Sequence, residues 1–341
     1  MKETAVSQER ERRRAGSASR VATLIANIYG VALIILLVMV FLPWRLWFVE
    51  VLSDLLEWVL LPSIPVVIVF IVLRDRRSVA IWSIPTLAFL YLFGGLFLPS
   101  WKPAPDSTAS SQHLRVMTWN LYGKDGLDRT PQVDILQNSG ADIIALQEVT
   151  EDATELIDSR LSDLYPYRIL VPGGIGGTGL LSKYPIETRE IFVAAPGAFN
   201  CIKALLNVNG KPITVMNVHP QPRYMLLQLV YTAQGSPQIN SLLNMLPLDG
   251  PTLMIGDFNL TDQSSDYKVL ARSRLHDAFR EVGWGFGVTW PVRAGRLNRF
   301  MPVARLDYVW HTDEFEAQSI RVGSRAISDH LPVIADLIFQ N

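Results

Sequence analysis

Five short polar clusters in this chain abut apolar runs, and their residue types are suited to acid–base and metal-dependent chemistry. They combine carboxylates, side-chain amides and imidazoles, and they are Trp119-Asn120, Gln147-Glu148, Asn217-Val218-His219, Gly256-Asp257-Phe258-Asn259 and Ser328-Asp329-His330. A single polar cluster after a strand is an ordinary turn. Five of them in one domain predict a catalytic rim, because loops at strand ends are where a rigid sheet presents reactive groups.

Two of the acids follow runs that read as buried strands. Glu148 follows Ile-Ile-Ala-Leu-Gln, and Asp257 follows Leu-Met-Ile-Gly. A carboxylate in such a place is costly unless it is paired, solvated or bound to a metal. Carboxylate and amide oxygens, without cysteine or clustered histidine, suit Mg²⁺ or Mn²⁺ better than Zn²⁺. For Glu148 considered alone, a simple strand-capping role is the alternative.

Asp257 and Asn259 alternate around Phe258, so an extended backbone would turn both polar side chains toward the same cavity. The acid can then orient or deprotonate water, while the amide contacts a phosphoryl oxygen. An Asx turn closed by Asp257 is the alternative, since such turns are common after strands.

The histidines divide into two groups. His330 follows Asp329, and Asp307 lies in the run Leu-Asp-Tyr-Val-Trp. An imidazole held by a carboxylate has a fixed tautomer and a stabilised cationic form, so such a pair can donate to a phosphate or relay a proton. His219, at the end of an apolar run, is the other expected functional imidazole. We expect the remaining three, His113, His276 and His311, to be ordinary surface residues.

Taken together and in order, these residues resemble the endonuclease/exonuclease/phosphatase superfamily. This is the fold of pancreatic-type deoxyribonuclease, apurinic endonucleases, neutral sphingomyelinases and inositol polyphosphate 5-phosphatases. The resemblance covers roughly 113–341 and implies a four-layer sandwich of two mixed β-sheets flanked by helices. The blocks that carry it are Thr118-Trp119-Asn120, Leu146-Gln147-Glu148-Val149, Leu181-Ser182-Lys183-Tyr184-Pro185-Ile186, Asn217-Val218-His219, Gly256-Asp257-Phe258-Asn259, Leu306-Asp307-Tyr308 and Ser328-Asp329-His330.

The resemblance implies a metal site and a hydrolytic activity on phosphoesters. Glu148 would be the principal ligand of Mg²⁺ or Mn²⁺, with Asn120 and Asp329 beside the metal. Positioning and charge stabilisation are most of what phosphoester hydrolysis needs. A binding module that kept the fold and lost turnover is the alternative class, but each block retains its chemically competent residue.

The same resemblance implies roles for the remaining residues. Asp257 would orient the attacking water, and Asn259 would bind the scissile phosphate. His330, paired with Asp307, would contact the phosphate or move the proton. His219 would be a further phosphate contact.

Apolar stretches precede this domain and predict membrane spans. Residues 21–43 and 79–98 carry no charge and are each long enough to cross a hydrocarbon core of about 30 Å. Residues 51–73 are less uniform, because Asp54 and Glu57 lie in the first third and two prolines near the middle. We expect a third span there, with an amphipathic interfacial stretch at 51–61 as the alternative.

Basic residues set the expected orientation. The segment 1–20 carries six Lys and Arg residues, and Arg74, Arg76 and Arg77 separate the second and third spans. The connection between the first two spans carries only Arg45. The positive-inside rule places the basic N-terminus in the cytoplasm. Three spans would then put the following domain outside the cytoplasm, whereas two would leave it inside.

Residues 99–112 are rich in Pro and Ser and read as a linker, which leaves 113–341 as a domain large enough for one sizeable core. That domain has 20 Lys and Arg against 24 Asp and Glu, a net charge of −4. This balance argues against a protein that holds nucleic acid mainly by neutralising phosphates. Cys201 is the only cysteine, so an intrachain disulfide is impossible.

Short apolar or alternating runs predict strands, and amphipathic runs predict helices. The expected strands are 114–119, 143–146, 179–181, 204–208, 213–218, 252–255, 306–310 and 331–338, with a hairpin at Asn209-Gly210. The expected helices are 130–138, 151–161, a stretch around 225–246, 267–271 and 275–281. This mixture favours an α/β or α+β sandwich over a simple doubly wound parallel sheet. The glycine-rich run 173–179 lacks the Gly-Lys-Ser/Thr ending of a P-loop and is expected to be a flexible loop.

The substrate class is less well defined by the sequence. Residues 284–305 mix aromatic side chains with Arg293, Arg296, Arg299 and Arg305. Such a segment could stack bases, contact anionic lipid headgroups or be an ordinary solvated loop. A short tether to the membrane favours a lipid phosphodiesterase or phosphatase, and an anchored nuclease is the alternative.

Overall fold

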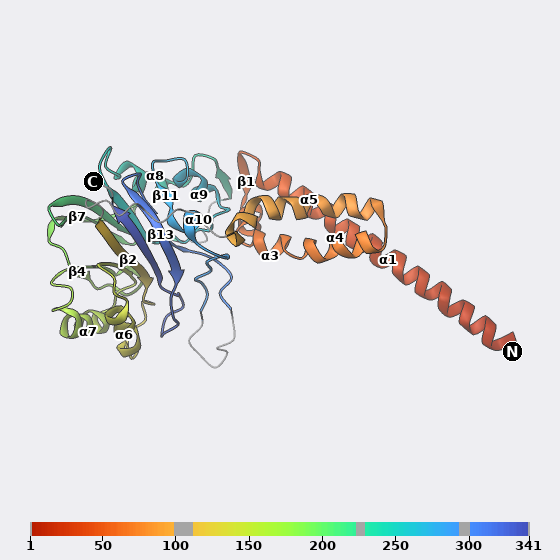
Figure 1. The fold of residues 1–341 in the computed structure, drawn as a ribbon, viewed down its shortest axis with the longest axis horizontal. Helices are drawn as coiled ribbons and strands as arrows, with labels where there is room; N and C mark the ends of the chain where they lie inside the picture. Colours follow the sequence, from red (N-terminus) through yellow and green to blue (C-terminus); the bar gives the residue numbers. More distant parts are fainter. Residues whose placement is uncertain (1, 99–111, 223–228, 293–300, 340–341) are drawn as a thin grey trace. The chain divides into compact units, whose positions relative to one another are not determined.

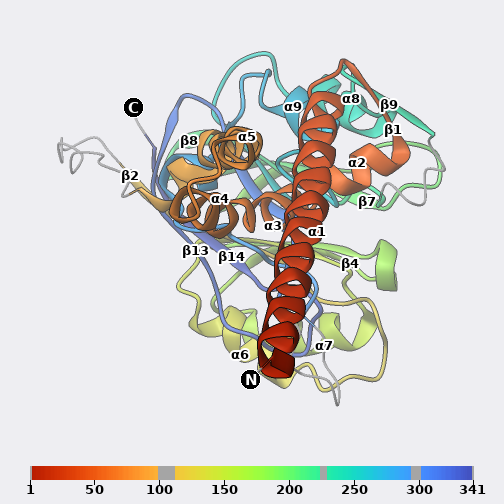
Figure 2. The same cartoon turned by 90° about the vertical axis from the view of Figure 1, so that its right-hand side faces the viewer.

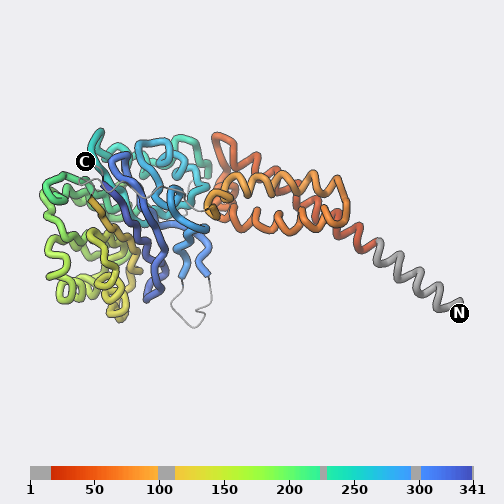
Figure 3. Tube along the Cα trace, viewed as in Figure 1, coloured from red at the N-terminus to blue at the C-terminus, as the bar shows by residue number. Residues whose placement is uncertain are grey.

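The computed structural model describes residues 2–98, 112–222, 229–292 and 301–339, and Figure 3 traces the chain. The chain forms two compact units, Met1–Gly95 and Leu96–Asn341. Most of the expected linker 99–112 lies outside the described residues. Gln112, its last residue, already begins strand β2.

The first unit is mainly helical. Its elements are α1 (Lys2–Val40), β1 (Trp44–Leu46), α2 (Trp47–Ser53), α3 (Leu56–Leu60), α4 (Ser63–Val72) and α5 (Arg76–Phe93). Helix α5 begins sharply because the Asp75 carboxylate accepts from the backbone N–H groups of Arg77 and Ser78. A 3₁₀ turn, η1 (Gly94–Phe97), follows α5.

Two helical segments of the described chain are long and apolar enough to cross a membrane. They are Ser17–Val40 and Arg76–Phe97, close to the spans expected at 21–43 and 79–98. The stretch expected at 51–73 is instead a pair of helical segments, Trp47–Ser53 and Leu56–Val72, bent by 75° at the break between them. The break falls at Asp54 and Leu55, so the chain has three candidate spans only if this bent pair counts as one.

Within the described residues, the second unit contains two six-stranded mixed sheets. The first has the order β13-β14-β2-β3-β5-β4, with β2 and β3 parallel. Its strands are β2 (Gln112–Asn120), β3 (Ile143–Gln147), β4 (Tyr167–Val171), β5 (Thr178–Ser182), β13 (Phe315–Val322) and β14 (Val333–Phe339).

The second sheet has the order β11-β12-β10-β8-β7-β6, with β8 and β10 parallel. Its strands are β6 (Ile186–Val193), β7 (Asn200–Val208), β8 (Lys211–Val218), β10 (Thr252–Asp257), β11 (His276–Asp277) and β12 (Asp307–His311). The remaining elements of the unit are η2 (Gly174–Gly176), β9 (Val230–Thr232), α6 (Thr130–Asn138), α7 (Glu151–Leu161), α8 (Pro237–Asn244), α9 (Ser265–Leu270) and α10 (Ala278–Val282).

Helices cover the outer faces of both sheets, which makes four layers. Figures 1 and 2 show α6 and α7 on one side of the strands and α8 and α9 on the other. One buried cluster joins Met117 and Trp119 of β2 to α6 and α7. A second joins Met216 of β8 and Met254 of β10 to α8 and α9. Alternate residues of these strands face the opposite sheet, and this inner layer leads to the polar strand ends.

The structure confirms the expected sandwich and corrects several of its elements. Helices α6 and α7 have the expected bounds, and Asn209 and Gly210 close the β7–β8 hairpin with φ angles of 55° and 89°. The helix expected around 225–246 is wrong over much of its length, because within it the described chain forms β9 and the shorter α8. Strands β4, β6, β11 and β13 were not expected, and β11 occupies residues that were assigned to the helix expected at 275–281, which begins only with α10 at Ala278. Strand β6 lies at a sheet edge with both faces largely exposed, so its sequence lacks strict alternation.

Candidate active site

The polar clusters converge because the strands that precede them end at the same edge. In each sheet a parallel pair supplies two of them: β2 and β3 lead to Asn120 and Glu148, and β8 and β10 lead to His219 and Asp257. Asp307, at the start of β12, is the antiparallel partner of Asp257. The structure therefore brings residues from both sheets into one buried polar group.

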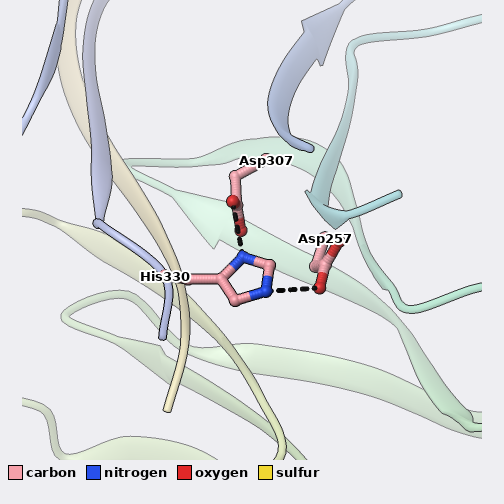
Figure 4. A group of neighbouring side chains, drawn as sticks. All are labelled: Asp257, Asp307 and His330. Carbon is pink, nitrogen blue, oxygen red and sulfur yellow. Dashed lines mark hydrogen bonds and ion pairs between the residues drawn. The ribbon is translucent and has the colours of Figure 1, made fainter. Parts of the chain in front are cut away.

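The Asp257 carboxylate is a central contact of this group and is almost fully buried. Its Oδ2 accepts from Asn120 Nδ2 at 3.0 Å. The same oxygen lies 3.6 Å from His219 Nε2 and 3.6 Å from His330 Nε2. Figure 4 shows His330 between Asp257 and Asp307.

His330 is held as a cation. Its Nδ1 lies 2.9 Å from Asp307 Oδ2, and its backbone N–H donates to Ser328 Oγ at 3.0 Å. Burial alone would lower the pKa of this imidazole, but the charges of Asp307 and Asp257 raise the pKa to about 10. The ring is therefore protonated at neutral pH and can donate a proton or a hydrogen bond from Nε2.

His219 has the opposite character although it faces the same carboxylate. Burial lowers the pKa of His219 to about 4, outweighing the attraction of Asp257. Its ring packs against Phe199 with centroids 4.6 Å apart. Its Nδ1 is buried and makes no hydrogen bond to any described residue. The site thus has one cationic and one neutral imidazole around one carboxylate.

Glu148 lies on the other side of Asn120 and is fixed by two hydrogen bonds. Asn120 Nδ2 donates to Glu148 Oε1 at 3.0 Å, and the Gly123 backbone N–H donates to Oε2 at 2.6 Å. Glu148 has a φ of 55°, an uncommon backbone conformation that its neighbours must hold in place. Burial raises the pKa of its carboxyl group, and Asp257 adds to this shift.

The surroundings of Asp329 indicate a missing positive charge. Burial raises the pKa of its carboxyl group, with further contributions from Glu148 and Asp257, although His330 opposes them. Its Oδ1 is buried and finds no hydrogen-bond partner within the described parts of the chain. A hard divalent cation would satisfy this oxygen and neutralise the carboxylates, so the residues fit the expected Mg²⁺ or Mn²⁺.

Asp257, Asp307 and His330 form a second possible arrangement for a metal. Their ligand atoms all lie within 4.8 Å of one another. However, His330 Nδ1 is engaged by Asp307, and the raised pKa keeps a proton on Nε2. We therefore favour a cation near Glu148 and Asp329, with His330 acting as a donor.

The side-chain contacts of Asn120 and the backbone conformation of Asn259 differ from what the sequence suggested. Asn120 Oδ1 accepts from the Tyr122 backbone N–H at 2.9 Å, so its amide nitrogen is the group that bridges the carboxylates. The extended backbone expected through Asn259 is wrong, since its φ is 51°. Asp257 Oδ1 closes an Asx turn on the Asn259 N–H, and Asn259 Nδ2 donates to Pro220 O at 3.0 Å. One oxygen of Asp257 thus makes the turn while the other faces the site.

Two residues from the polar clusters join the sheets to each other. Gln147 Nε2 donates to Asn217 Oδ1 at 2.7 Å across the inner layer. Asn217 Nδ2 in turn donates to Leu146 O, Thr178 Oγ1 and Gly179 O. Both side chains are fully buried, so their amides fix how the two halves of the site face each other.

Other supporting residues were missed by sequence reasoning. Ser328 Oγ donates to Asn120 O at 2.6 Å and so ties the His330 segment to β2. The guanidinium of Arg129 donates to the carbonyls of Leu121, Tyr122 and Lys124 and thereby shapes the loop that holds Glu148. The cluster that contains Ser328 was noticed, but the sequence has no local signal for Arg129, because a buried arginine is recognised only by its partners.

Arg305 corrects one expectation about ligand binding. Its side chain is 4% exposed and pairs with Asp277 at 2.8 Å and Asp262 at 3.2 Å. It is therefore a structural ion pair and is not available to bases or lipid headgroups. Arg293, Arg296 and Arg299, which were considered with it, lie outside the described residues.

The glycine-rich run forms a loop, as expected, but its backbone is closely packed. The Gly173 N–H donates to Val149 O at 3.0 Å, next to Glu148. A Cβ atom on Gly177 would lie 2.0 Å from the same oxygen. This packing makes the run a support for Glu148 and contradicts the expectation of a freely flexible loop.

Position 256, immediately before Asp257, requires glycine because its backbone lies equally close to a neighbouring strand, at Val218. It has a φ of 151°, and a Cβ atom there would lie 2.0 Å from Val218 O. We expect Gly256→Ala to lower the free energy of unfolding by roughly 2–4 kcal/mol, measured by thermal unfolding in detergent. Gly210→Ala is the matched control, because its φ is also positive but no described atom lies within 4 Å of the added Cβ. Equal effects of the two substitutions would contradict the steric explanation.

The comparisons with known proteins agree with the fold. Residues 117–330 match the endonuclease/exonuclease/phosphatase family, and the chain belongs to this family. It is 27% identical over 264 residues to the uncharacterized protein YbhP of Escherichia coli K12, covering 68% of this chain and 99% of YbhP. It is 24% identical over 233 residues to Sphingomyelinase C 2 of Leptospira interrogans, covering 56% of this chain and 36% of that protein.

Solved structures support the same fold. The structure of D. rerio TDP2 complexed with single strand DNA product is similar with a TM-score of 0.55 at 17% identity. The match covers 66% of this chain and 98% of that one. The chain therefore has the phosphoesterase fold of the family, with a buried Asp/Asp/His cluster that could hold a metal ion.

Proposed function

We propose that this protein is a membrane-anchored hydrolase that cleaves phosphoesters with the help of Mg²⁺ or Mn²⁺. The observation that carries the proposal is the convergence of Glu148, Asp257 and His330 on one buried edge, each fixed by hydrogen bonds. A structural role alone would not require a cationic imidazole beside several partly unsatisfied carboxylates.

Glu148 and Asp329 would hold the cation, and Asn120 would lie beside it. A bound divalent cation would supply Lewis-acid stabilisation of charge on a phosphoryl oxygen. Gly123 and Asn120 keep the Glu148 carboxylate in a single orientation. This pre-organisation matters because positioning and charge stabilisation account for most of phosphoryl-transfer catalysis.

The other half of the site would act on the attacking water and the phosphate. Asp257 Oδ2 would orient a water molecule and accept its proton. His330, charged and supported by Asp307, would donate to a phosphoryl oxygen or move the proton to the leaving group. His219 and Asn259 would be neutral donors to the phosphate.

A lipid phosphoester is the substrate class that we favour. Within the second unit, the Phe97 ring lies 5.9 Å from the Trp284 ring and 5.2 Å from the Phe286 ring. Phe97 is also the last residue of a candidate span, and the Trp284 side chain is 72% exposed. Exposed aromatic rings are typical of proteins that meet the lipid–water interface. Similarity to Sphingomyelinase C 2 supports the same class.

An anchored nuclease is the second candidate, since the fold is similar to that of a protein crystallised with a DNA product. The test is hydrolysis by the purified full chain in detergent of bis-p-nitrophenyl phosphate, sphingomyelin in micelles, phosphoinositide and plasmid DNA, with Mg²⁺ or EDTA. EDTA-sensitive cleavage of a lipid would support the proposal. Cleavage of DNA alone would favour the nuclease, and inactivity of folded, metal-loaded protein on every substrate would contradict hydrolysis.

We also propose that the second unit lies outside the cytoplasm. The basic segments 1–20 and 74–77 would face the cytoplasm, and the bent helical pair would complete a third crossing. The expected result is that Glu151→Cys, on the exposed first turn of α7, reacts with a membrane-impermeant maleimide in intact cells. Wild-type protein should stay unlabelled, because Cys201 is buried and burial raises the pKa of its thiol to about 12. Labelling of Glu151→Cys only after lysis would place the domain inside.

A further inference from the structure

A second group of histidines and acids lies at the opposite end of β12 from the catalytic edge. Strand β11 pairs antiparallel with β12, and His276 lies directly opposite His311 with ring centroids 5.7 Å apart. Asp307 begins the same strand and His311 ends it, a separation of four residues or about 13 Å along a strand. The histidine pair is therefore distinct from the proposed hydrolytic site.

His311 is not the ordinary surface residue that the sequence suggested, because it is only 2% exposed. Its Nδ1 lies 3.0 Å from Thr312 O, and a carbonyl can only accept, so Nδ1 carries the ring proton. With the proton on Nδ1, the other ring nitrogen, Nε2, is the one available as a ligand; it is buried and has no hydrogen-bond partner among the residues that the structure describes. Glu281 Oε2 lies 3.6 Å from this nitrogen. The buried Nε2 of His311 is the unsatisfied atom of this pair, and a cation or a proton placed between it and the carboxylate would satisfy it.

His276 is also oriented by a contact at one of its ring nitrogens, but here the partner is a carboxylate. Its Nε2 lies 2.7 Å from Asp313 Oδ1, which leaves Nδ1 directed at Glu281 Oε1 at 4.0 Å. Metal-binding histidines commonly give one ring N–H to a carboxylate or a backbone carbonyl, which fixes the other nitrogen as the ligand. For His276 the supporting group is the carboxylate of Asp313, and for His311 it is the backbone carbonyl of Thr312.

We propose that His276, His311 and Glu281 form a second metal site, for a divalent transition metal such as Zn²⁺. A tetrahedral ion with bonds of about 2.0–2.1 Å keeps its ligands about 3.3–3.4 Å apart. The separation of 3.6 Å runs from His311 Nε2 to Glu281 Oε2, and that of 4.0 Å runs from His276 Nδ1 to Glu281 Oε1. The three residues do not already bring one donor atom each within 4.8 Å of one another, so binding one ion requires a closing movement. The His276 side chain is 44% exposed and can make that movement by rotation, with water as a fourth ligand.

The donor set separates this site from the hydrolytic one. Two imidazoles and one carboxylate suit Zn²⁺, whereas oxygen-rich sites suit Mg²⁺. Bound metal would join the edge strand β11 and helix α10, which carries Glu281, to strand β12. Because metal bound only by the folded protein adds to folding free energy, the site would stabilise this edge of the second sheet.

The test uses the full chain in detergent, stripped with a chelator and dialysed against Zn²⁺ with excess Mg²⁺. The Glu148→Gln background weakens the hydrolytic cation site, and the Zn²⁺ that is lost on adding His276→Gln to this background reports the second site. We expect one tightly bound Zn²⁺ per chain and a higher melting temperature. His276→Gln should weaken binding by about 100-fold or more, and Asp313→Asn, which only positions His276, by about 10-fold.

His113→Gln is the matched control, since His113 is an exposed strand histidine outside the cluster. It should bind Zn²⁺ as the background protein does. Co²⁺ provides a second readout, because the visible absorption of four-coordinate Co²⁺ should appear in the background protein and be lost in His276→Gln. Absence of stoichiometric Zn²⁺, or equal binding by His276→Gln, would overturn the proposal. Either result is independent of whether the chain hydrolyses phosphoesters.

Discussion

Replacing Glu148 by glutamine is expected to lower phosphoester hydrolysis by about 1,000-fold or more, because it removes the principal charge that would hold the cation. Glutamine has nearly the same shape, and its oxygen can still accept from Gly123 N–H. The loss should therefore be chemical, with little change in stability. The measurement is kcat/KM for bis-p-nitrophenyl phosphate over a titration of Mg²⁺ or Mn²⁺.

The matched control for this substitution is Glu151→Gln. Glu151 is an exposed acid on the first turn of α7, three residues further along the chain. It should retain activity within about twofold, since exposed surface substitutions have small effects. If Glu148→Gln kept more than about a tenth of the wild-type activity, Glu148 would not be the principal ligand.

Replacing His330 by glutamine is expected to lower kcat by about 100- to 1,000-fold, because a cationic donor becomes a neutral one. The charge arises from Asp307 at 2.9 Å and from Asp257, which together raise the pKa of His330 to about 10. Asp307→Asn should have a smaller effect of about 10- to 100-fold, since it leaves the imidazole in place but removes its supporting charge.

Metal dependence distinguishes this prediction from the first. The midpoint of the Mg²⁺ titration should change little in His330→Gln and rise strongly in Glu148→Gln. His113→Gln, on an exposed part of β2, is the control for loss of a histidine. A large shift of the metal midpoint in His330→Gln would instead favour the arrangement in which Asp257, Asp307 and His330 hold the ion.

The convergence of polar residues at one edge of the two sheets could be predicted from the sequence because its signals are local. A buried apolar run places the first polar residues after it at a strand end. Asn120 follows its run directly, while Gln147 precedes Glu148 and Gly256 precedes Asp257. Helix α7 was also predictable, since its apolar face and the acids of its first turn, Glu151 and Asp152, are both visible in a short window.

The features that were missed depend on contacts that are distant in sequence. Arg305 looks like a ligand-binding residue until its partners Asp277 and Asp262, 28 and 43 residues away, are seen. His311 looks like a surface residue because its burial depends on other elements of the fold. Asn259 was misplaced for a local reason, since the same Asp257 side chain that faces the site also turns the backbone out of the extended form.

The amide pair Gln147 and Asn217 has a consequence for how activity arises during folding. Each sheet alone carries an incomplete set of groups: Asn120 and Glu148 come from one, and His219 and Asp257 from the other. Consider a folding intermediate that has native secondary structure but in which the two sheets are wrongly aligned with each other. It would keep the far-ultraviolet circular dichroism of the native protein but would not act on substrate. Under the proposed function, hydrolysis would therefore report whether the two sheets are correctly aligned with each other.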